Sequence, residues 1–247
     1  MRLREGRHRQ RLGKLLIDGI RELDRAVQAG VRILEIFTVL PSVAYKNTNI
    51  HQVSESVMRK IAFGDRNEGI VAVAEEPAWS FDAFEAKIKE RENPLFAVLV
   101  GVEKPGNLGA VVRCADAAGM DGVIIADSLV DPFHSNSIRS SMGTVFSIPM
   151  ASESSAVVLR WLKGRRIQIA AAWCIGNTVP YTAIDFRQPT AFVLGNEAVG
   201  LPELWKGETI TSISLPMLGI ADSLNVSVAA GVLFYEARRQ RTLQATE

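Results

Sequence analysis

"LFAVLVGVEKPGNLGAVVRCADAAGMDGVIIAD" (residues 95–127) contains two apolar runs separated by a segment with helical character. The runs, at 95–102 and 122–127, show no polar–apolar alternation, which is typical of strands buried on both faces. The residues between them predict a helix over 107–118. A strand, a helix and a second strand in this order indicate a parallel sheet covered by helices on both faces. In such a fold the ligand lies at the carboxyl ends of the strands.

Strand and helix patterns alternate along the rest of the chain, and a charged segment divides them into two groups. The later group has strands at 167–172, 190–195 and 210–216, and helices near 154–164 and 224–240. The earlier group has strands at 14–19, 33–40 and 69–76, and helices at 20–30 and 54–62. Pro77 and the charged helical stretch 81–94 separate them. We predict an α/β protein with a small α/β domain over 1–77, a linker over 78–93 and a mainly parallel sheet domain over 94–247.

The composition is that of a folded globular protein. The 247 residues are 47% hydrophobic and 22% charged, with a formal net charge of +1, and these are ordinary values. The sequence has no apolar run of the ~18 residues that a membrane helix requires and no signal-peptide pattern. Cys114 and Cys174 lack metal-ligand spacing and lie in apolar surroundings, which is typical of core cysteines in a reducing compartment. We expect a cytoplasmic protein with no metal site and no membrane partner.

Residues 1–14 are strongly basic. Their one acidic residue, Glu5, is outnumbered by Arg2, Arg4, Arg7, Arg9, Arg11 and Lys14. Clustered cations of this kind neutralise nucleic-acid phosphates by counterion release, and the resulting binding is sensitive to salt. The alternative is a solvated, frayed terminus, and a mitochondrial presequence is disfavoured because the stretch has no Ser and no apolar stripe. If the cluster binds nucleic acid, Arg7, Arg9 and Arg11 are its predicted contacts.

Arg113 is a long cation in a helical segment of small and apolar residues, "NLGAVVRCADAAG" (107–119). Its neighbours on the helix include Gly109 and Asp116, three or four positions away. The segment alone leaves two interpretations open: a surface ion pair with Asp116, or an anionic ligand for which the small residues leave room. Asn107 is suited to capping the start of this helix, because its side-chain oxygen accepts from free backbone N–H groups.

A tight turn follows the strand at 190–195. In "VLGNEAVGLP" (193–202), Gly195 and Gly200 enclose Asn196 and Glu197, and glycine lets a backbone approach a ligand closely. The turn lacks the G-x-G-x-x-G pattern of dinucleotide sites and the Lys-Ser/Thr ending of phosphate loops. A nucleotide-dependent oxidoreductase is therefore excluded. Glu197 either starts a helix or faces a ligand, and the pattern favours neither.

The segment "LPMLGIADSLNVSVAAG" (215–231) leads into the last helix. Asp222 or Ser223 is a suitable N-cap. Polar Ser223 and Asn225 both lie at the helix start, where unpaired backbone donors gather, and capping explains one of them better than the pair. The small residues from Ser227 to Gly231 allow another element to pack closely, either from this chain or from a second copy.

In this order, the three segments resemble the SpoU (TrmH-like) family of SPOUT-class RNA 2′-O-ribose methyltransferases. The family's first motif matches Asn107, Gly109, Ala110 and Arg113, and the second matches residues 195–201. The third matches Leu215, Pro216 and Met217, followed by Ser223, Leu224, Asn225, Ser227 and Ala229. The resemblance covers about residues 95–240 and, more loosely, the N-terminal domain. Lys104-Pro105 departs from the frequent Asp-Pro, and Leu215 replaces the commoner Ile.

The resemblance implies a SPOUT-type trefoil knot, formed by segments 193–201 and 213–225, that holds S-adenosyl-L-methionine. The implied cofactor contacts are Leu194, Gly195, Asn196, Gly200, Leu215, Met217, Ser223 and Leu224. The implied catalytic set is Arg113, Asn107, Glu197, Ser223 and Asn225. The family assigns proton removal to the position of Arg113. Because a guanidinium is essentially never neutral, we expect Arg113 to bind the RNA phosphate beside the target ribose instead.

The resemblance also implies a homodimer and an RNA substrate. A separate N-terminal domain is similar to that of members acting on ribosomal RNA, so 23S rRNA is favoured. The alternatives are a tRNA 2′-O-methyltransferase and a non-catalytic RNA-binding or ribosome-assembly protein of the same fold. On this interpretation, the RNA contacts include Arg7, Arg9, Arg11 and Arg113.

Overall fold

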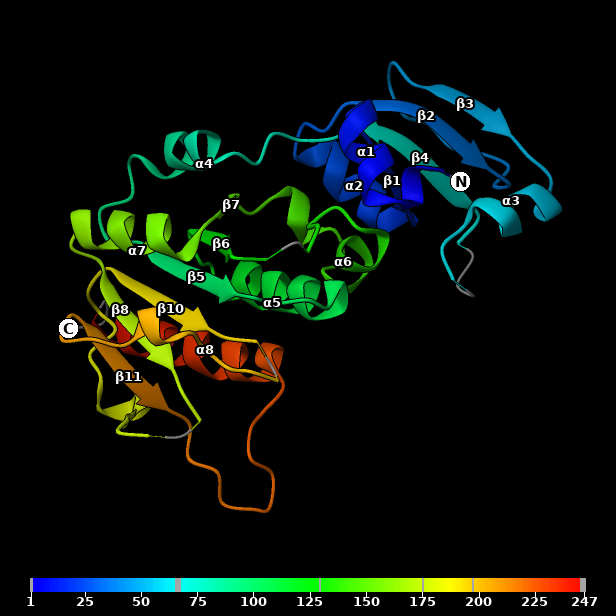
Figure 1. Cartoon of the computed structure of the whole chain (residues 1–247). Helices are drawn as coiled ribbons and strands as arrows, with labels where there is room; N and C mark the ends of the chain where they lie inside the picture. Colours follow the sequence, from blue (N-terminus) through cyan, green and yellow to red (C-terminus); the bar gives the residue numbers. More distant parts are fainter. Residues whose placement is uncertain (1, 65–67, 129, 175, 197, 245–247) are drawn as a thin grey trace.

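A seven-stranded sheet forms the centre of the C-terminal part of the chain in the computed structural model (Figure 1). The structure describes residues 2–64, 68–128, 130–174, 176–196 and 198–244. The strand order is β7-β6-β5-β10-β8-β11-β9, and every neighbouring pair is parallel. The strands are β5 (Leu95–Val100), β6 (Gly122–Ala126), β7 (Met150–Glu153), β8 (Gln168–Ala172), β9 (Val179–Pro180), β10 (Thr190–Leu194) and β11 (Ile210–Ser214). The predicted parallel sheet is confirmed.

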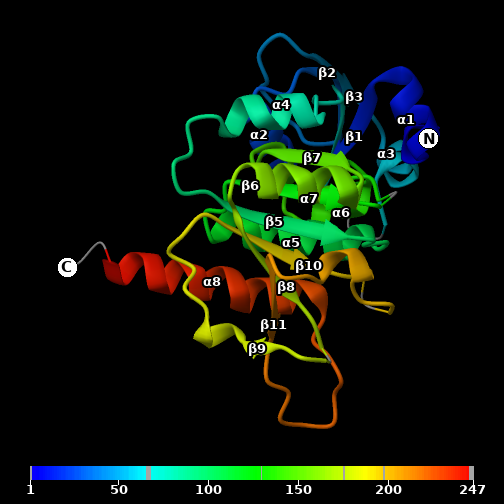
Figure 2. The same cartoon turned by 60° about the vertical axis from the view of Figure 1, so that its left-hand side comes forward.

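Helices cover both faces of this sheet (Figure 2). Successive residues of β5 face opposite cores, as the two-residue period of a strand requires. Leu95, Ala97 and Leu99 pack with α5 (Pro105–Ala117) and α8 (Val226–Gln244). Phe96, Val98 and Val100 pack with α4 (Phe81–Ile88) and α7 (Ser155–Gly164). Because both sets are buried, the run is apolar throughout.

The N-terminal part is a four-stranded sheet in the order β1-β4-β2-β3. Its strands are β1 (Lys14–Asp18), β2 (Ile33–Thr38), β3 (Asn49–Gln52) and β4 (Ile70–Glu75). One face packs on α2 (Ile20–Gln28) through residues such as Leu15, Ile17, Leu23 and Ile36. The remaining elements are η1 (Arg2–Arg4), α1 (Gly6–Leu12) and α3 (Glu55–Ile61).

Helix α4 lies within the segment expected to be a linker, and it packs on the C-terminal sheet. Phe84 and Ile88 are buried. The Phe84 ring lies 5.7 Å from the Phe96 ring and 5.9 Å from the Trp161 ring, between centroids. Gly122 at the start of β6 leaves room for Phe84, because a Cβ there would lie 2.4 Å from the ring. This segment therefore belongs to the C-terminal core.

Arg9 joins the two parts of the molecule, which corrects its predicted role. The residue is 2% exposed, and its Nε donates to the Asp131 carboxylate at 3.0 Å. Its Nη1 donates to the carbonyls of Leu3 and Arg4 at 3.0 and 2.8 Å. The guanidinium is thus buried and hydrogen-bonded within the protein, and the prediction that Arg9 contacts RNA is wrong. A frayed terminus is equally wrong for Gly6–Leu12, which forms α1.

Several short elements were missing from the sequence-based expectations. They are α1, α6 (Ser135–Ser140), β3, β7, β9 and the 3-10 turns η2 (Thr144–Phe146), η3 (Tyr181–Ala183) and η4 (Glu203–Trp205). Most are short, and β3 is an exposed edge strand without a buried side, so hydrophobic periodicity gives no signal. No helix in the described part of the chain has the length and apolar character to cross a bilayer. The trefoil knot stays a prediction.

Candidate active site

The three motif segments leave the sheet at its carboxyl edge. The first motif follows β5, the second follows β10 and the third follows β11. β5 and β10 are adjacent and parallel, and β8 lies between β10 and β11. Parallel strands end at the same edge, where α/β proteins bind ligands. Residues separated by more than a hundred positions are thus brought together.

A contact between two asparagines joins the first and third motifs. Nδ2 of Asn225 donates to Oδ1 of Asn107 at 3.3 Å. Oδ1 of Asn225 accepts from the backbone N–H and the hydroxyl of Ser227, at 2.9 and 2.7 Å. Asn225 is therefore the cap of α8, in place of the predicted Asp222 or Ser223. Asn107 lies inside the first turn of α5, which starts at Pro105, so its predicted capping role is wrong.

Arg113 lies on the exposed side of α5. Within the described residues it forms no ion pair with Asp116, whose carboxylate accepts instead from the Ser147 hydroxyl at 3.3 Å. The surface ion pair between Arg113 and Asp116 that the sequence left open is therefore absent from the described residues. Burial raises the pKa of the neighbouring Cys114 thiol, which the charge of Arg113 opposes. The thiol stays neutral near pH 7, so it is not an anionic partner for Arg113.

The small residue at Gly109 serves packing. A Cβ at this position would lie 2.0 Å from the Ser140 hydroxyl and 2.4 Å from the Ser137 carbonyl, both on α6. The interpretation that small residues beside Arg113 leave room for a ribose is therefore wrong for Gly109, because α6 fills that space. Close contact between α5 and α6 fixes the helix that carries Asn107 and Arg113.

Gly109→Ala is expected to destabilise the protein by about 1–3 kcal/mol, since the added methyl group overpacks a contact with α6 backbone. The measurement is the free energy of unfolding by denaturant titration. Gly164→Ala is the matched control, because Gly164 is also helical and a Cβ there meets nothing within 4 Å. Equal stability of the two variants would contradict this packing role.

The second motif forms a turn held by Asn196. Its Nδ2 donates to the Gly101 carbonyl at 2.8 Å, and its Oδ1 accepts from the Ala198 backbone N–H at 2.7 Å. A Cβ on Gly195 would lie 2.6 Å from the carbonyl carbon of Gly200, and Gly200 has φ +70°. Only glycine fits the first position without moving backbone, and the second favours it strongly. Glu197, predicted as catalytic, lies outside the described residues.

The third motif begins beside β11 and then leaves the body of the domain. Leu215 and Met217 are half-buried, whereas Ser223 and Leu224 are exposed. Between them, Leu218 and Ile220 are fully exposed, and the loop projects from the domain in both views (Figure 1, Figure 2). Leu194, at the end of β10, is buried. Of these predicted cofactor residues, Leu194, Leu215 and Met217 are therefore at least partly packed in the domain, whereas Ser223 and Leu224 lie on the exposed loop.

Two residues near the site escaped the sequence analysis. Gly101 has φ +64° and its carbonyl accepts from Asn196. Asn136 of α6 lies beside the start of α5, since a Cβ on Gly106 would be 3.2 Å from its Nδ2. A glycine ending an apolar strand was a usable signal for Gly101. The sequence contains no such signal for Asn136, because its contact exists only once the fold has brought α6 next to α5.

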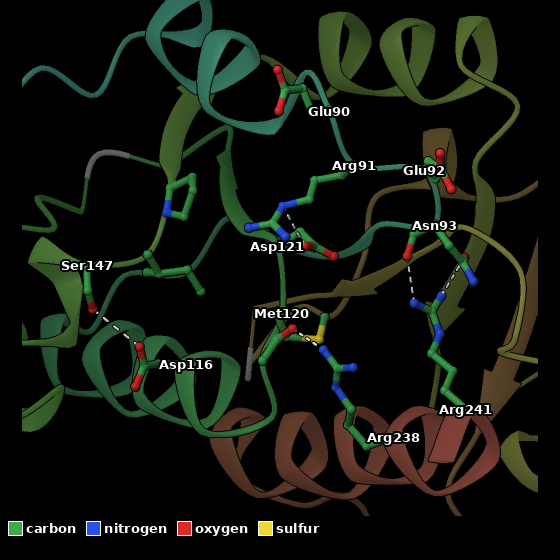
Figure 3. A pocket seen from close by; sticks show the side chains of 13 residues that line it. Glu90, Arg91, Glu92, Asn93, Asp116, Met120, Asp121, Ser147, Arg238 and Arg241 are labelled. Atoms are coloured by element: carbon green, nitrogen blue, oxygen red, sulfur yellow. Dashed lines mark hydrogen bonds and ion pairs between the residues drawn. The ribbon is translucent and has the colours of Figure 1, made fainter. Parts of the chain in front are cut away.

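A polar cavity of about 670 Å³ lies at the opposite edge of the sheet (Figure 3). Asn93 precedes β5 and Asp121 precedes β6, so the cavity is at the amino ends of the strands. Two of its arginines have partners in the protein: Arg91 pairs with Asp121 at 3.2 Å, and Arg241 donates to the Asn93 carbonyl at 2.7 Å. None of the predicted site residues lines it. We therefore place the active site at the carboxyl edge.

Comparison with known proteins shows the family of the chain. Residues 94–235 match the model of the SpoU rRNA Methylase family, and residues 1–72 match the MRM3-like substrate binding domain. The chain belongs to the SpoU rRNA methylase family. The predicted family resemblance, and the α/β fold with an N-terminal substrate-binding domain, are confirmed. Membership makes the protein a methyltransferase of a family that uses S-adenosylmethionine.

Relatives of this SpoU protein include enzymes of known activity. The 23S rRNA (uridine(2479)-2′-O)-methyltransferase of Streptomyces viridochromogenes is 33% identical over 94% of this chain and 85% of its own. The crystal structure of the SpoU methyltransferase AviRb from Streptomyces viridochromogenes, in complex with AdoMet, has a TM-score of 0.85. It is 31% identical over 98% of this chain and 96% of its own. The TrmH/SpoU tRNA modifying enzyme of A. aeolicus has a TM-score of 0.55 and 27% identity. That match covers 66% of this chain and 86% of the A. aeolicus chain.

Proposed function

We propose that this protein transfers a methyl group from S-adenosyl-L-methionine to a ribose 2′-hydroxyl of 23S rRNA. The observation that carries the proposal is the hydrogen bond between Asn225, at the start of α8, and Asn107 on α5. Helix α5 also carries Arg113. A protein that only bound RNA would not need these two motifs to be held together. The substrate named for the 33%-identical relative is also 23S rRNA.

The second and third motifs fit the proposed cofactor. The bound donor supplies an electrophilic methyl group on its sulfonium centre. Adenine has apolar faces and hydrogen-bonding edges, so it suits backbone groups set among apolar side chains. Neither Gly195 nor Gly200 carries a side chain, so backbone groups of this turn can approach a ligand, and Leu194 immediately before it is apolar. We assign cofactor binding to Leu194, Gly195, Asn196, Gly200, Leu215, Met217, Ser223 and Leu224.

Arg113 is proposed to grip the phosphate beside the target ribose. A guanidinium donates two parallel hydrogen bonds to phosphate oxygens, and this fixes the orientation of the bound RNA. Arg113 stays charged and cannot remove a proton, so the proton of the 2′-hydroxyl passes to an oxygen of that phosphate. Asn107 and Asn225 orient the ribose or Arg113, and Ser223 and Glu197 complete the pocket. Alignment of the hydroxyl with the methyl donor supplies much of the rate acceleration.

The N-terminal domain supports 23S rRNA over tRNA. The match to the tRNA modifying enzyme covers 66% of this chain, whereas the match to AviRb covers 98%. The additional domain offers exposed cations, including Arg7 and Arg11, and cations attract phosphates. A tRNA 2′-O-methyltransferase is the second candidate, because tRNA modifying enzymes occur in the same fold.

A methyl-transfer assay tests this proposal. The purified protein is incubated with methyl-labelled S-adenosylmethionine and either a 23S rRNA transcript or a tRNA mixture. Label is expected in 23S rRNA, at a ribose. Label in tRNA alone would support the second candidate instead, and cofactor binding without transfer to either RNA would favour a non-catalytic RNA-binding protein.

The exposed face of α8 is proposed to pair with a second copy of the chain. Val228, Val232 and Tyr235 are exposed and follow helical spacing, so they form one apolar stripe. The other side of α8 is occupied within the chain, where the Cys114 thiol lies 3.7 Å from the Ser227 carbonyl. An exposed apolar stripe of this kind is typical of a protein interface. A symmetric homodimer covers it in both copies.

Val228→Asp is expected to convert the dimer to a monomer, because a buried unpaired carboxylate is costly. Multi-angle light scattering measures the mass. Val27→Asp, at an exposed valine on α2, is expected to stay dimeric. A wild-type monomer, or a dimeric Val228→Asp protein, would contradict this interface.

The proposed partners are thus RNA and a second copy of the chain. Within the described residues no group of His, Cys, Asp and Glu could hold a metal ion. Cys114 and Cys174 are both free thiols. A cytoplasmic location stays a prediction.

A further inference from the structure

The N-terminal sheet carries an apolar pocket on the face away from α2. The pocket has a volume of about 320 Å³ and is lined by side chains from η1, α3 and three strands. They include Leu3, Leu16, Phe37, Val57, Ile61 and Val71. The core residues of the same strands, such as Leu15 and Ile36, point to the opposite face. The pocket therefore lies over a second, smaller apolar cluster around Met58 and Ala62, apart from the core on the α2 side.

Arg4 holds two walls of this pocket together. Its Nη2 donates to the Ile61 carbonyl at 2.8 Å and also to the Ala62 carbonyl, at the end of α3. Leu3, the neighbour of Arg4 on η1, is thereby fixed opposite Val57 and Ile61. The carbonyl end of a helix favours a cation. The pocket is thus formed before any ligand arrives.

A pair of stacked aromatic rings lies beside the pocket, with its outer faces left for a further ring. Phe37 on β2 pairs with His51 on β3, and their rings stack with centroids 5.1 Å apart and planes 21° apart. Phe37 also lines the pocket, while about half of the His51 side chain is exposed. Unstacked RNA bases bind proteins by stacking on such rings.

Cations border the same face. Lys14 shares the face of β1 with Leu16, because alternate residues of a strand point the same way. Lys60 is exposed in the last turn of α3, three residues after Val57, which lines the pocket. Two acids of this face have partners: Glu75 binds Arg32 at 2.9 Å, and Glu35 lies 3.6 Å from Nε2 of His51. The charge around the pocket suits a phosphate backbone.

We propose that this outer-face pocket receives an unpaired nucleobase of the RNA substrate, stacked against Phe37 and His51. Phosphates on either side of the base lie near Lys14 and Lys60. A base fits because its faces are apolar and its backbone is anionic, whereas the base pairs of a duplex are stacked and cannot enter. This inference rests on the proposed function only in taking RNA as the substrate. It assigns the N-terminal domain to a loop or bulge of the RNA.

Val57→Glu tests the pocket by placing a carboxylate at its rim. Val57 is 41% exposed, so the variant is expected to fold, and Val27→Glu on α2 is the matched control at 42% exposure. Binding to a 23S rRNA transcript is measured by fluorescence anisotropy at one fixed salt concentration. We expect Val57→Glu to weaken binding at least ~10-fold, the range of one lost base stack, with Val27→Glu close to wild type.

His51→Ala removes stacking surface without adding a negative charge and is expected to weaken binding about fivefold or more. Wild-type-like binding by both Val57→Glu and His51→Ala would overturn the proposal. Thermal denaturation of each variant identifies unfolding. If Val57→Glu lost binding to ribosomal particles but not to the naked transcript, the occupant would be a protein segment, and the proposal would be wrong.

Photo-crosslinking separates this inference from the proposed function. A 23S rRNA transcript containing 4-thiouridine is irradiated with the wild-type protein, and crosslinked peptides are identified by mass spectrometry. Crosslinks in residues 33–61 are expected, and crosslinks confined to other parts of the chain would contradict the pocket. Methyl transfer is measured on the same samples. Crosslinks without methyl transfer would leave the pocket standing while refuting the proposed reaction.

Discussion

Arg113→Ala is expected to lower methyl transfer to RNA at least ~100-fold, the scale of losing a preorganised charged donor at a reaction centre. Arg113 is exposed on α5 and has no ion pair with Asp116 within the described residues, so its removal breaks no ion pair with that carboxylate. S-adenosylmethionine binding is assigned to other segments and is expected to be unchanged. Rates with labelled donor and cofactor affinity by calorimetry measure the two properties separately.

Two further variants sharpen the result for Arg113. Arg113→Lys retains the charge and loses the planar fork, so partial activity is expected if phosphate binding is the role. Arg160→Ala removes an exposed arginine from α7 and is expected to be fully active. Normal methyl transfer by Arg113→Ala would show that this residue has no part in the reaction.

Arg9→Ala is expected to cost about 3 kcal/mol of folding stability, because removing one partner of a buried ion pair strands the other. Asp131, only 21% exposed, loses the guanidinium that binds it. The carbonyls of Leu3 and Arg4 lose a donor as well. Denaturant unfolding measures the change. Arg7→Ala, at an exposed position of the same helix, is expected to change stability by less than about 0.5 kcal/mol.

RNA binding distinguishes the two arginines further. Arg7 is expected to contribute to RNA affinity without affecting stability, whereas Arg9 is expected to affect stability. If Arg9→Ala kept wild-type stability and specifically lost RNA affinity, the buried role would be wrong. The original expectation that Arg9 contacts RNA would then be restored.

The parallel sheet was predictable because its strands are buried on both faces. A run such as residues 95–100 carries the signal in every position, whereas β3 has no buried position and carries none. The family was also predictable, because three motifs resemble those of the SpoU family in the same order, among them Asn107, Arg113, Asn196 and Asn225.

Long-range pairings set the limit of the sequence analysis. Arg9 differs in no local feature from Arg7 and Arg11, and its partner Asp131 is distant in the chain. Gly109 resembles a residue that leaves room for a ligand, yet α6 fills the space. Asn225, and neither Asp222 nor Ser223, caps α8. Each outcome depends on which element packs opposite, and local sequence does not encode that.

Mapping of ribose methylation on 23S rRNA tests the central claim most directly. An unmodified 23S rRNA transcript is incubated with S-adenosylmethionine and either wild-type protein or Arg113→Ala, digested to nucleosides and short fragments, and analysed by mass spectrometry. We predict one or more 2′-O-methylated nucleotides with wild-type protein and none with Arg113→Ala. A methyl group found on a base, or ribose methylation at equal levels with both proteins, would contradict the account.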